Sequence, residues 1–408
     1  MQQPRFLDRM SHPHIITLVM ATAFGPAAMN LFLPSLPLIA HYFNTEDSTV
    51  QLAVSLYLAA TGLLQLAIGP LSDQYGRRPV LLGCISVALV ATVVGIYATS
   101  IEMFLAARIF QGTAIAGMVV SRAAIRDMVD TDEAASRIGY VAMAMTLAPM
   151  VGPVVGGYLA EIFGWQATFW LIFGFGVVAL VLVWGDMGET IHSLGGSFRS
   201  QLRAYPELLR SRRFMGYALT STFASGAFFS FVGGSPFLAN NFYQLPESEQ
   251  GYYFALAAGG YLIGNFLSGR YSRRFGIDAM CVSGGVVASA GMLLALAFVP
   301  LGWFHPLAFY GPVFAIGVGN GLTMPNSSAG IVSARPRLAG SASGLGGFFQ
   351  LGGGAILSGL SGHVLDPESG PLPLIIIMLA CTVLSMATAL YAAVVAKSLA
   401  KSENQPAN

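Results

Sequence analysis

Long apolar runs alternate with short polar segments along almost the whole chain of 408 residues. Each run has about 20 residues, the length that an α-helix needs to cross the roughly 30 Å hydrocarbon core of a bilayer. Strands of a transmembrane barrel would instead alternate apolar and polar positions over about 10 residues. The pattern predicts twelve membrane-spanning helices, with approximate bounds 14–37, 50–71, 80–99, 101–123, 138–160, 165–185, 214–237, 250–270, 279–299, 306–331, 339–362 and 371–396.

The composition excludes a soluble protein. Hydrophobic residues make up 55% and charged residues 10% of the chain, whereas soluble domains carry roughly 25% charged residues. The net charge of +1 gives no basic excess for binding nucleic acid. Cys84, Cys281 and Cys381 are far apart within apolar runs, so they predict neither a metal site nor a disulfide framework.

The positive charges predict the orientation of the helices. Of the 20 basic residues, 19 fall before the first run, after the last, or in alternate loops between them. Cytoplasmic loops are the ones that carry excess Lys and Arg. We therefore expect both termini in the cytoplasm, and we expect the first apolar run to be a retained helix rather than a cleaved signal peptide.

The longest internal loop divides the predicted helices six to six. This gives an N-terminal bundle (1–185), a cytoplasmic linker (186–213), and a C-terminal bundle with a short tail (214–408). A weak repeat supports the division, because Gly69–Arg78 and Gly264–Gly276 both place small residues at a helix end before paired arginines beside a glycine. Such a parallel repeat is typical of transporters whose two halves rock against each other.

Several motifs resemble those of a known family. Gly69-x-x-x-Asp73-x-x-Gly76-Arg77-Arg78 resembles the loop signature of the major facilitator superfamily, and Arg108-x-x-Gln111-Gly112 resembles its second signature. Gly152-Pro153-x-x-Gly156-Gly157 is similar to the signature of its drug exporters.

Two further stretches, Arg122–Asp127 and Gly340–Gln350, resemble the Bcr/CflA drug-resistance branch of that superfamily. The resemblance covers almost the whole chain. It implies an all-helical integral membrane protein with two pseudo-symmetric six-helix bundles, which exports small amphipathic compounds by alternating access, in exchange for protons. The alternative is a transporter of the same fold for one metabolite, as an uptake system or an uncoupled facilitator.

The sequence departs from the branch at two positions. A basic residue usually follows the loop aspartate, but here the residue is Gln74. The first helix usually reads Asp-Met-Tyr-Leu-Pro, but here it reads Asn30-Leu-Phe-Leu-Pro34. All 19 acidic residues lie in loops or near helix ends, so proton exchange would have to use a marginal carboxylate, Glu102 or Asp73 first.

The loop signature predicts a gate at the cytoplasmic end of the second helix. Asp73 and the Arg77–Arg78 pair can form ion pairs across helix ends in one conformation and release them in another. Asp127, which follows Arg126 at the end of the fourth helix, is a plausible partner for Arg77. The alternative is that these arginines only anchor the topology.

Arg108 is the basic residue at membrane depth, where a charge costs at least about 2.5–3.5 kcal/mol. We therefore expect it to face a cavity or a partner, although snorkelling to the outer surface is an alternative. Gln111 lies three positions later, on the same helix face. We expect Arg108 to tune substrate charge or to assist proton exchange.

The fifth helix carries small residues together with Pro153. Gly152 and Gly156, four positions apart, let two backbones approach closely, and Gly157 extends this face. Proline bends the helix. We expect a packing hinge between the two halves.

If the resemblance holds, helices 1, 4, 7 and 10 line the substrate cavity. Their aromatic and methionine side chains can repack around varied apolar shapes, which favours amphipathic substrates over sugars or nucleotides. Each of these side chains could equally contact lipid or core. The predicted lining residues are Met29, Asn30, Phe32, Arg108, Gln111, Met118, Phe223, Phe228, Phe231, Phe314, Asn320, Met324 and Asn326.

We also weighed a membrane-embedded enzyme. No carboxylate pair or histidine cluster is predicted to meet at membrane depth, and the sequence contains no phosphate-binding lysine loop. We therefore expect a transporter rather than an enzyme, with no cofactor, no metal and no nucleic-acid partner. We expect a monomer that contacts the lipid bilayer, in the inner membrane of a bacterium.

Overall fold

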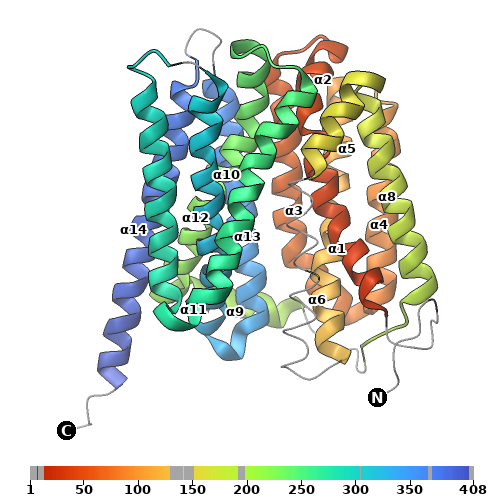
Figure 1. Ribbon diagram of the computed structural model, residues 1–408. Coiled ribbons are helices and arrows are strands. Elements are labelled where there is room, and N and C mark those ends of the chain that lie inside the picture. The colour runs from red at the N-terminus through yellow and green to blue at the C-terminus, as the bar shows by residue number, and fades with distance from the viewer. Residues whose placement is uncertain are drawn as a thin grey trace. The chain divides into compact units, whose positions relative to one another are not determined.

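The computed structural model describes residues 7, 13–128, 141, 151–191, 198–303, 305–365 and 370–403. Every regular element within these ranges is a helix (Figure 1). The elements of the first half are α1 (Ile15–Asn30), η1 (Leu33–Ser35), α2 (Leu36–Phe43), α3 (Asp47–Tyr75), α4 (Arg77–Ile96), α5 (Ile101–Gln111), η2 (Gly112–Ile115), α6 (Ala116–Met128), the helix Val151–Phe163, and α8 (Trp165–Asp186).

The linker and the second half follow the same pattern. Their elements are α9 (Phe198–Arg210), α10 (Arg212–Phe237), η3 (Leu238–Phe242), α11 (Glu247–Phe298), α12 (Pro306–Ser333), η4 (Pro336–Leu338), α13 (Ala339–Val364) and α14 (Leu372–Glu403).

The helices agree with the predicted spans. In the described part of the chain, eight helices are long and apolar enough to cross a membrane. One of them, α11, is two helices that meet at Gly276, so these eight account for nine predicted spans. Val151–Phe163, α10 and α13 correspond to the other three; α10 and α13 are rich in Gly and Ser, which lowers their hydropathy but suits close helix packing.

Two predicted spans are broken rather than continuous. The first one stops at Asn30, turns through η1 and resumes as α2, because Pro34 has no N–H for a helical hydrogen bond. The fourth one contains the short 3₁₀ segment η2 between α5 and α6, and no proline explains that break. Most other helices extend a few residues beyond the predicted ends.

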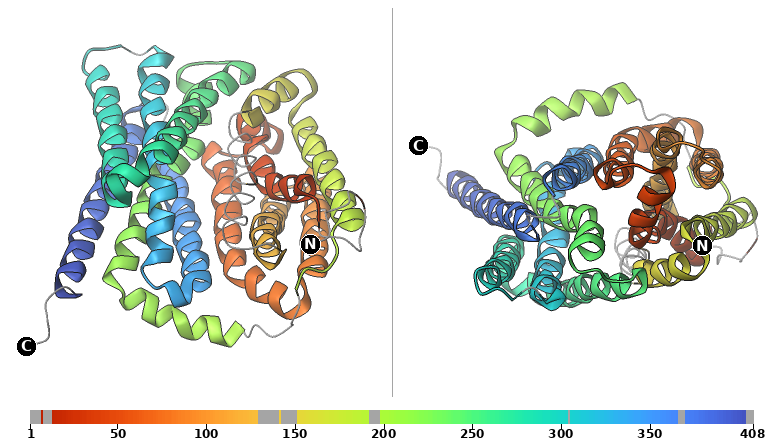
Figure 2. Two further views of the ribbon diagram at one scale, coloured as in Figure 1. Left: turned by 60° about the horizontal axis from the view of Figure 1, so that its bottom comes forward. Right: turned by 90° about the horizontal axis from the view of Figure 1, so that it is seen from above.

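The chain forms two compact units. Unit 1 comprises residues 1–200 together with 239–255, and unit 2 comprises residues 201–238 together with 256–408. In unit 1, α1 packs against α6 and α8, and α4 packs against α5 and α8, around a buried apolar core. In unit 2, α10 packs against α12, α13 and α14. The right panel of Figure 2 shows the helices of each unit nearly end-on.

The linker helix α9 differs in direction from the long helices of unit 2. It lies across their ends rather than alongside them (Figure 2). Leu208 is fully buried, whereas Leu209 is exposed. Glu207 pairs with Arg335 and Arg337 in the segment that joins α12 to α13, with the Glu207 Oε1 to Arg337 Nη2 distance at 2.5 Å.

The predicted repeat is visible in the backbone. Gly76 separates α3 from α4 with φ 98° and ψ 150°, and Gly276 divides α11 with φ 83° and ψ 159°. A residue with a Cβ rarely adopts this region, so both turns require glycine. The two halves therefore use the same turn after their second helix.

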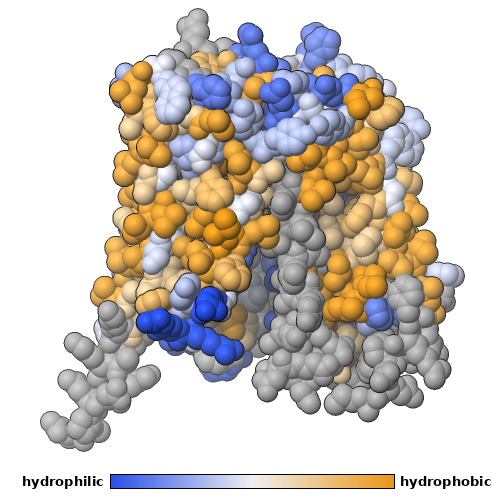
Figure 3. Space-filling view, viewed as in Figure 1, coloured by the Kyte–Doolittle hydropathy of each residue, from blue (hydrophilic) through white to orange (hydrophobic). Residues whose placement is uncertain are grey.

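The surface carries the mark of a membrane protein in both units. Figure 3 shows hydrophobic side chains over the flanks of the helices, with hydrophilic side chains gathered towards the helix ends. Large apolar side chains such as Val90, Ile162, Phe266 and Ile356 are exposed. A soluble protein would hide such patches, so the flanks fit contact with lipid tails.

Candidate functional site: two polar clusters in unit 1

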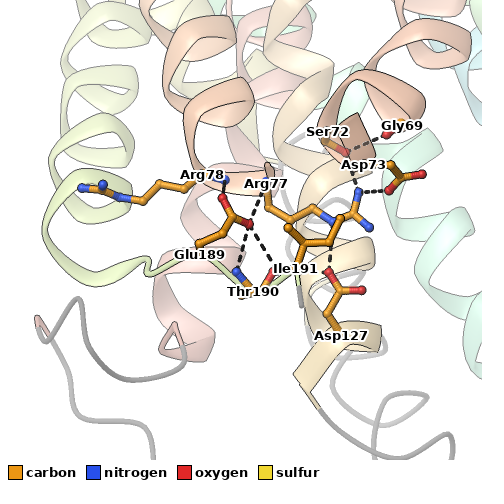
Figure 4. A network of polar contacts seen from close by, with 9 residues as sticks. All are labelled: Gly69, Ser72, Asp73, Arg77, Arg78, Asp127, Glu189, Thr190 and Ile191. Carbon is orange, nitrogen blue, oxygen red and sulfur yellow. Dashed lines mark hydrogen bonds and ion pairs between the residues drawn. The ribbon is translucent and has the colours of Figure 1, made fainter. Parts of the chain in front are cut away.

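The loop signature forms an ion-pair cluster where α3, α4 and α6 end or begin (Figure 4). Arg77 is at its centre, with 8% of its side chain exposed. Its Nη1 pairs with Asp73, and its Nε donates to Asp127 Oδ2 at 3.0 Å. Nη1 also donates to Ser72 Oγ at 2.6 Å. The predicted partnership of Arg77 with Asp127 is therefore present, and Asp73 shares the same guanidinium.

The cluster ties three helices together through one side chain. Ser72 and Asp73 lie in the last turn of α3, Arg77 begins α4, and Asp127 lies at the end of α6. Asp73 and Asp127 remain 27% and 22% exposed, so their hydration is only partly removed. An ion pair of this kind is less costly to form than a fully buried one, and it can be broken by a change in protonation or helix position.

Glu189, which was not predicted from the sequence, joins this cluster from the segment that follows α8. Its Oε1 accepts from the Arg77 backbone N at 2.9 Å, and its Oε2 accepts from the Arg78 backbone N at 3.3 Å. Figure 4 shows this carboxylate against the start of α4. Helix N-termini have unpaired N–H groups, and Gly76 has no side chain to cap them. A Cβ at Gly76 would also overlap the Glu189 carboxylate.

The remaining residues of the loop signature have different roles. Arg78 extends away from the cluster, and its Nη2 donates to the Trp184 carbonyl at 3.0 Å. The Gly69 carbonyl accepts from Ser72 Oγ at 2.8 Å. Arg126 is exposed on α6. These three contribute less to the cluster than Asp73, Arg77 and Asp127 do.

Arg108 forms the second cluster, at membrane depth on α5. It is 1% exposed. Its Nη1 donates to the Ala28 carbonyl at 3.2 Å and to Gln111 Oε1, and its Nε is 3.4 Å from the Ala53 carbonyl. The predicted partnership with Gln111 is therefore present, and Arg108 does not snorkel to the surface. The Ala28 carbonyl belongs to the last turn of α1, where helical partners end.

Aromatic rings surround the Arg108 guanidinium. Its Cζ lies 4.0 Å from the ring centroid of Phe32, 4.5 Å from that of Tyr57 and 6.0 Å from that of Phe169. A cation over an aromatic face is attracted by the ring quadrupole, and this is strongest where water is excluded. Phe32 is thus buried against Arg108 rather than exposed to solvent.

Gln111 and Asn30 satisfy nearby backbone and side-chain groups. Gln111 Nε2 donates to Thr92 Oγ1 at 2.8 Å, which links Arg108 to α4. Asn30 Nδ2 donates to the Pro26 carbonyl at 2.8 Å, four positions earlier in the same helix. The buried amide at the break of the first span therefore has the partner that its burial requires. Met29 and Met118 are buried nearby in unit 1.

The helix Val151–Phe163 packs closely on two neighbours within unit 1. A Cβ at Gly156 would overlap the Leu31 carbonyl, and one at Gly152 would lie 3.1 Å from Asn30 Cβ. A Cβ at Gly157 would overlap the Glu247 carbonyl at the start of α11. The close backbone approach predicted for these glycines is present, and a hinge role for Pro153 and its neighbours stays a prediction.

The predicted cavity residues of unit 2 lie on α10 and α12. Phe231, Asn320 and Asn326 are buried. The side chains of Phe223, Phe228 and Met324 are partly buried, and that of Phe314 is 36% exposed. Asn326 Nδ2 donates to Ser268 Oγ at 2.8 Å, which ties α12 to α11. A cavity shared by Asn320 and the residues of unit 1 stays a prediction.

A family comparison decides the class of the chain. The model of the Major Facilitator Superfamily matches residues 18–358. The chain belongs to this superfamily. The all-helical major facilitator fold predicted from the sequence is thereby confirmed.

Individual relatives narrow the branch. This major facilitator chain is 28% identical over 379 residues to a bicyclomycin resistance protein homolog of Haemophilus influenzae, covering 91% of the chain and 94% of the relative. It is 27% identical over 372 residues to multidrug resistance protein D of Escherichia coli, covering 90% and 92%. The predicted resemblance to the drug-resistance branch is confirmed.

A solved structure supports the same fold. A bacterial homolog of the human lysosomal transporter Spinster, in an inward-facing and occupied conformation, superposes with a TM-score of 0.72 at 16% identity. The alignment covers 96% of this chain and 98% of that one. At this identity the likeness shows the shared major facilitator fold alone.

Two acids of this major facilitator chain, Asp186 and Asp278, form hydrogen bonds that were not predicted from the sequence. Asp186 is fully buried and accepts from the backbone N of His14 at 2.8 Å and from Thr17 Oγ1 at 2.6 Å, at the start of α1. In unit 2, Tyr217 donates to Asp278 Oδ1 at 2.5 Å. Both pairs join residues far apart in sequence, and the sequence carried one usable signal, an acid directly after a predicted span.

Proposed function

We propose that this chain exports small amphipathic compounds, antibacterial drugs among them, from the cytoplasm of a bacterium by alternating access. The observation that carries the proposal is that relatives named for drug resistance align with about nine-tenths of the chain. The same alignment range holds the loop signature, Arg108 and the glycine-rich helix, so the parts on which transport depends lie inside it.

The Arg77 cluster supports a conformational role for the loop signature. Its two carboxylates and one guanidinium hold α3, α4 and α6 at a common end. A packed cluster with discrete partners favours two states over a continuous deformation. In the proposed cycle, these pairs form in one state and separate in the other.

Exchange for protons is part of the proposal. Asp73 and Asp127 share Arg77 and are both partly exposed, so a proton on either would weaken the ion pair and favour the open arrangement. The proposed orientation places both termini in the cytoplasm of the inner membrane. Its support is the alternation of basic and non-basic loops.

Drug sensitivity tests the export proposal. Expression of the chain in a bacterial strain that lacks its main efflux pumps should raise the inhibitory concentrations of several chemically unrelated antibiotics and dyes. Asp73→Asn, at equal membrane abundance, should remove most of that protection. Protection against no compound, together with uptake of a single nutrient, would favour a specific metabolite transporter instead.

Proton exchange needs a separate measurement. Purified protein in liposomes that contain a pH-sensitive dye should move protons when a transported drug is added. Drug transport without proton movement would leave export intact and would reject the exchange. Asp127→Asn should reduce the proton signal and drug transport together if this cluster couples them.

A further inference from the structure

The charge of Arg108 is buried without a counter-charge. Its guanidinium is 1% exposed and contacts the carbonyls of Ala28 and Ala53, the amide of Gln111 and aromatic faces. All of these groups are neutral. A cation taken out of water is normally paired with an acid, because its hydration is lost and must be replaced.

No acid within the described ranges contacts this guanidinium. Glu102 is on the same helix, but it is exposed and lies six positions earlier, which is about 9 Å along the axis. The positive charge at this depth is therefore not neutralised by a carboxylate of the described chain.

The guanidinium also has unused donors. Arg108 Nη2 is buried and has no hydrogen-bond partner among the described residues. A guanidinium carries five N–H donors in a planar fork that matches a carboxylate. A free, desolvated donor pair beside aromatic rings can receive a ligand whose head is an anion and whose body is apolar.

Phe32 places its ring over the guanidinium from the break in the first span. It follows α1 and precedes η1, inside the break of the first span. A ring carried by a break can move without unwinding a continuous helix. A ligand that pairs with Nη2 must therefore make room beside this fully buried ring.

We propose that Arg108 selects anionic amphiphiles, small molecules with a carboxylate head and an aromatic or aliphatic body, over lipophilic cations. This inference rests on the proposed export function and names its substrate class. The ligand carboxylate pairs with Nη2, and its apolar body lies against the aromatic side chains near Phe32 and Tyr57. A lipophilic cation meets an uncompensated like charge at the same place.

The expected difference in affinity between the anionic and the cationic ligand follows from the fixed charge of Arg108. Even at about 8 Å, farther than a direct pair with Nη2, two unit charges at an effective dielectric of 20 interact by about 2 kcal/mol, which is about 30-fold in affinity. The sign is favourable for a carboxylate and unfavourable for an ammonium. We therefore expect the carboxylate to bind at least about 30-fold more tightly than the cation.

Three matched probes test the inference. They share a 4-(naphthalen-1-yl)butyl body and differ in the head, which is a carboxylate, a primary amide or a trimethylammonium group. Binding of each radiolabelled probe is measured on the full-length protein in lipid nanodiscs at pH 7. We expect the order carboxylate, amide, ammonium for the wild type.

Variants separate the charge of Arg108 from its structural contacts. Asn30→Asp places a carboxylate two residues from Ala28, whose carbonyl accepts a hydrogen bond from Arg108. This variant should therefore reduce the preference for the carboxylate probe over the ammonium probe to within about 3-fold. Arg108→Lys keeps the charge and should keep the order of the probes. Arg337→Gln removes an arginine that is 72% exposed and far from Arg108 in sequence, and it should leave the binding order of the probes unchanged.

The wild-type result decides the inference even if an Arg108 variant does not fold. Equal binding of the three probes, tighter binding of the ammonium probe, or no binding of any probe would overturn it. Protection against drugs in cells is measured independently. A protein that protects cells but shows no carboxylate preference refutes the substrate class and leaves the export proposal standing.

Discussion

Asp127→Asn tests whether the Arg77 cluster stabilises unit 1. The substitution keeps the shape of the side chain but removes the charge that faces Arg77 Nε at 3.0 Å. It also weakens the acceptor of the Thr190 hydroxyl, whose Oγ1 lies 3.3 Å away. Arg77 cannot move into water to compensate, because only 8% of its side chain is exposed.

The structure sets the expected magnitude. Complete loss of partners for a buried charge costs about 3–5 kcal/mol. Arg77 keeps Asp73 and Ser72, so the cost should be nearer that of one charged hydrogen bond, about 1.5–3 kcal/mol. For a unit of about 200 residues, each kcal/mol lowers the melting temperature by about 2–4 °C, which predicts a decrease of about 3–12 °C.

Thermal unfolding of the purified protein in detergent, followed by intrinsic fluorescence, measures this decrease. Asp47→Asn is the matched control, because Asp47 lies at the start of α3 and makes an exposed hydrogen bond to Asn241 that should contribute less than about 1 kcal/mol. A double-mutant cycle with Arg77→Gln then isolates the pair. Equal melting temperatures for wild type and Asp127→Asn, or additive effects in the cycle, would refute the claim that this pair stabilises unit 1.

Two further predictions concern packing and pH. Gly156→Val should lower the free energy of unfolding by at least about 1–3 kcal/mol and reduce the yield of monodisperse protein in gel filtration, because a Cβ at this position overlaps the Leu31 carbonyl. Gly83→Ala is the control and should be tolerated, because a Cβ there meets no atom within 4 Å. A hydrogen bond from Arg337 holds the pKa of Glu207 below its ordinary value, so this contact stabilises α9 at neutral pH and is lost as the pH falls through that lowered pKa. The hydrogen-exchange protection factors of residues 204–210, which correct for the intrinsic pH dependence of exchange, should therefore stay constant down to about pH 5 and decrease below about pH 4. Constant protection factors over the whole range would contradict the contact.

Most of the fold was predictable from local sequence patterns, because each membrane span is recognisable by itself. Twenty apolar residues identify a membrane helix without reference to any other part of the chain. The pairing of Arg108 with Gln111 was predictable for the same reason, since residues three apart share a helix face.

Contacts between distant segments could not be predicted in the same way. The η2 segment between α5 and α6 contains no proline that would indicate a break in the helix. The aromatic surround of Arg108 draws Phe32 from the first span, Tyr57 from the second and Phe169 from the sixth. Sequence spacing says nothing about which rings meet across three helices, so the surround required the packed structure.

Two acids at and just after the end of α8 show why an acid with hydrogen-bond partners need not be a proton carrier. Asp186 and Glu189, three residues apart, accept hydrogen bonds from the N-terminal N–H groups of α1 and α4, respectively. A helix N-terminus carries a partial positive charge that stabilises a carboxylate, so both acids are held by helix ends. Asp73 and Asp127 differ, because they are paired with a side chain that can leave them. Of these four acids, the two that share Arg77 are therefore the ones that a conformational cycle can release, whereas the two that cap helices hold unit 1 together.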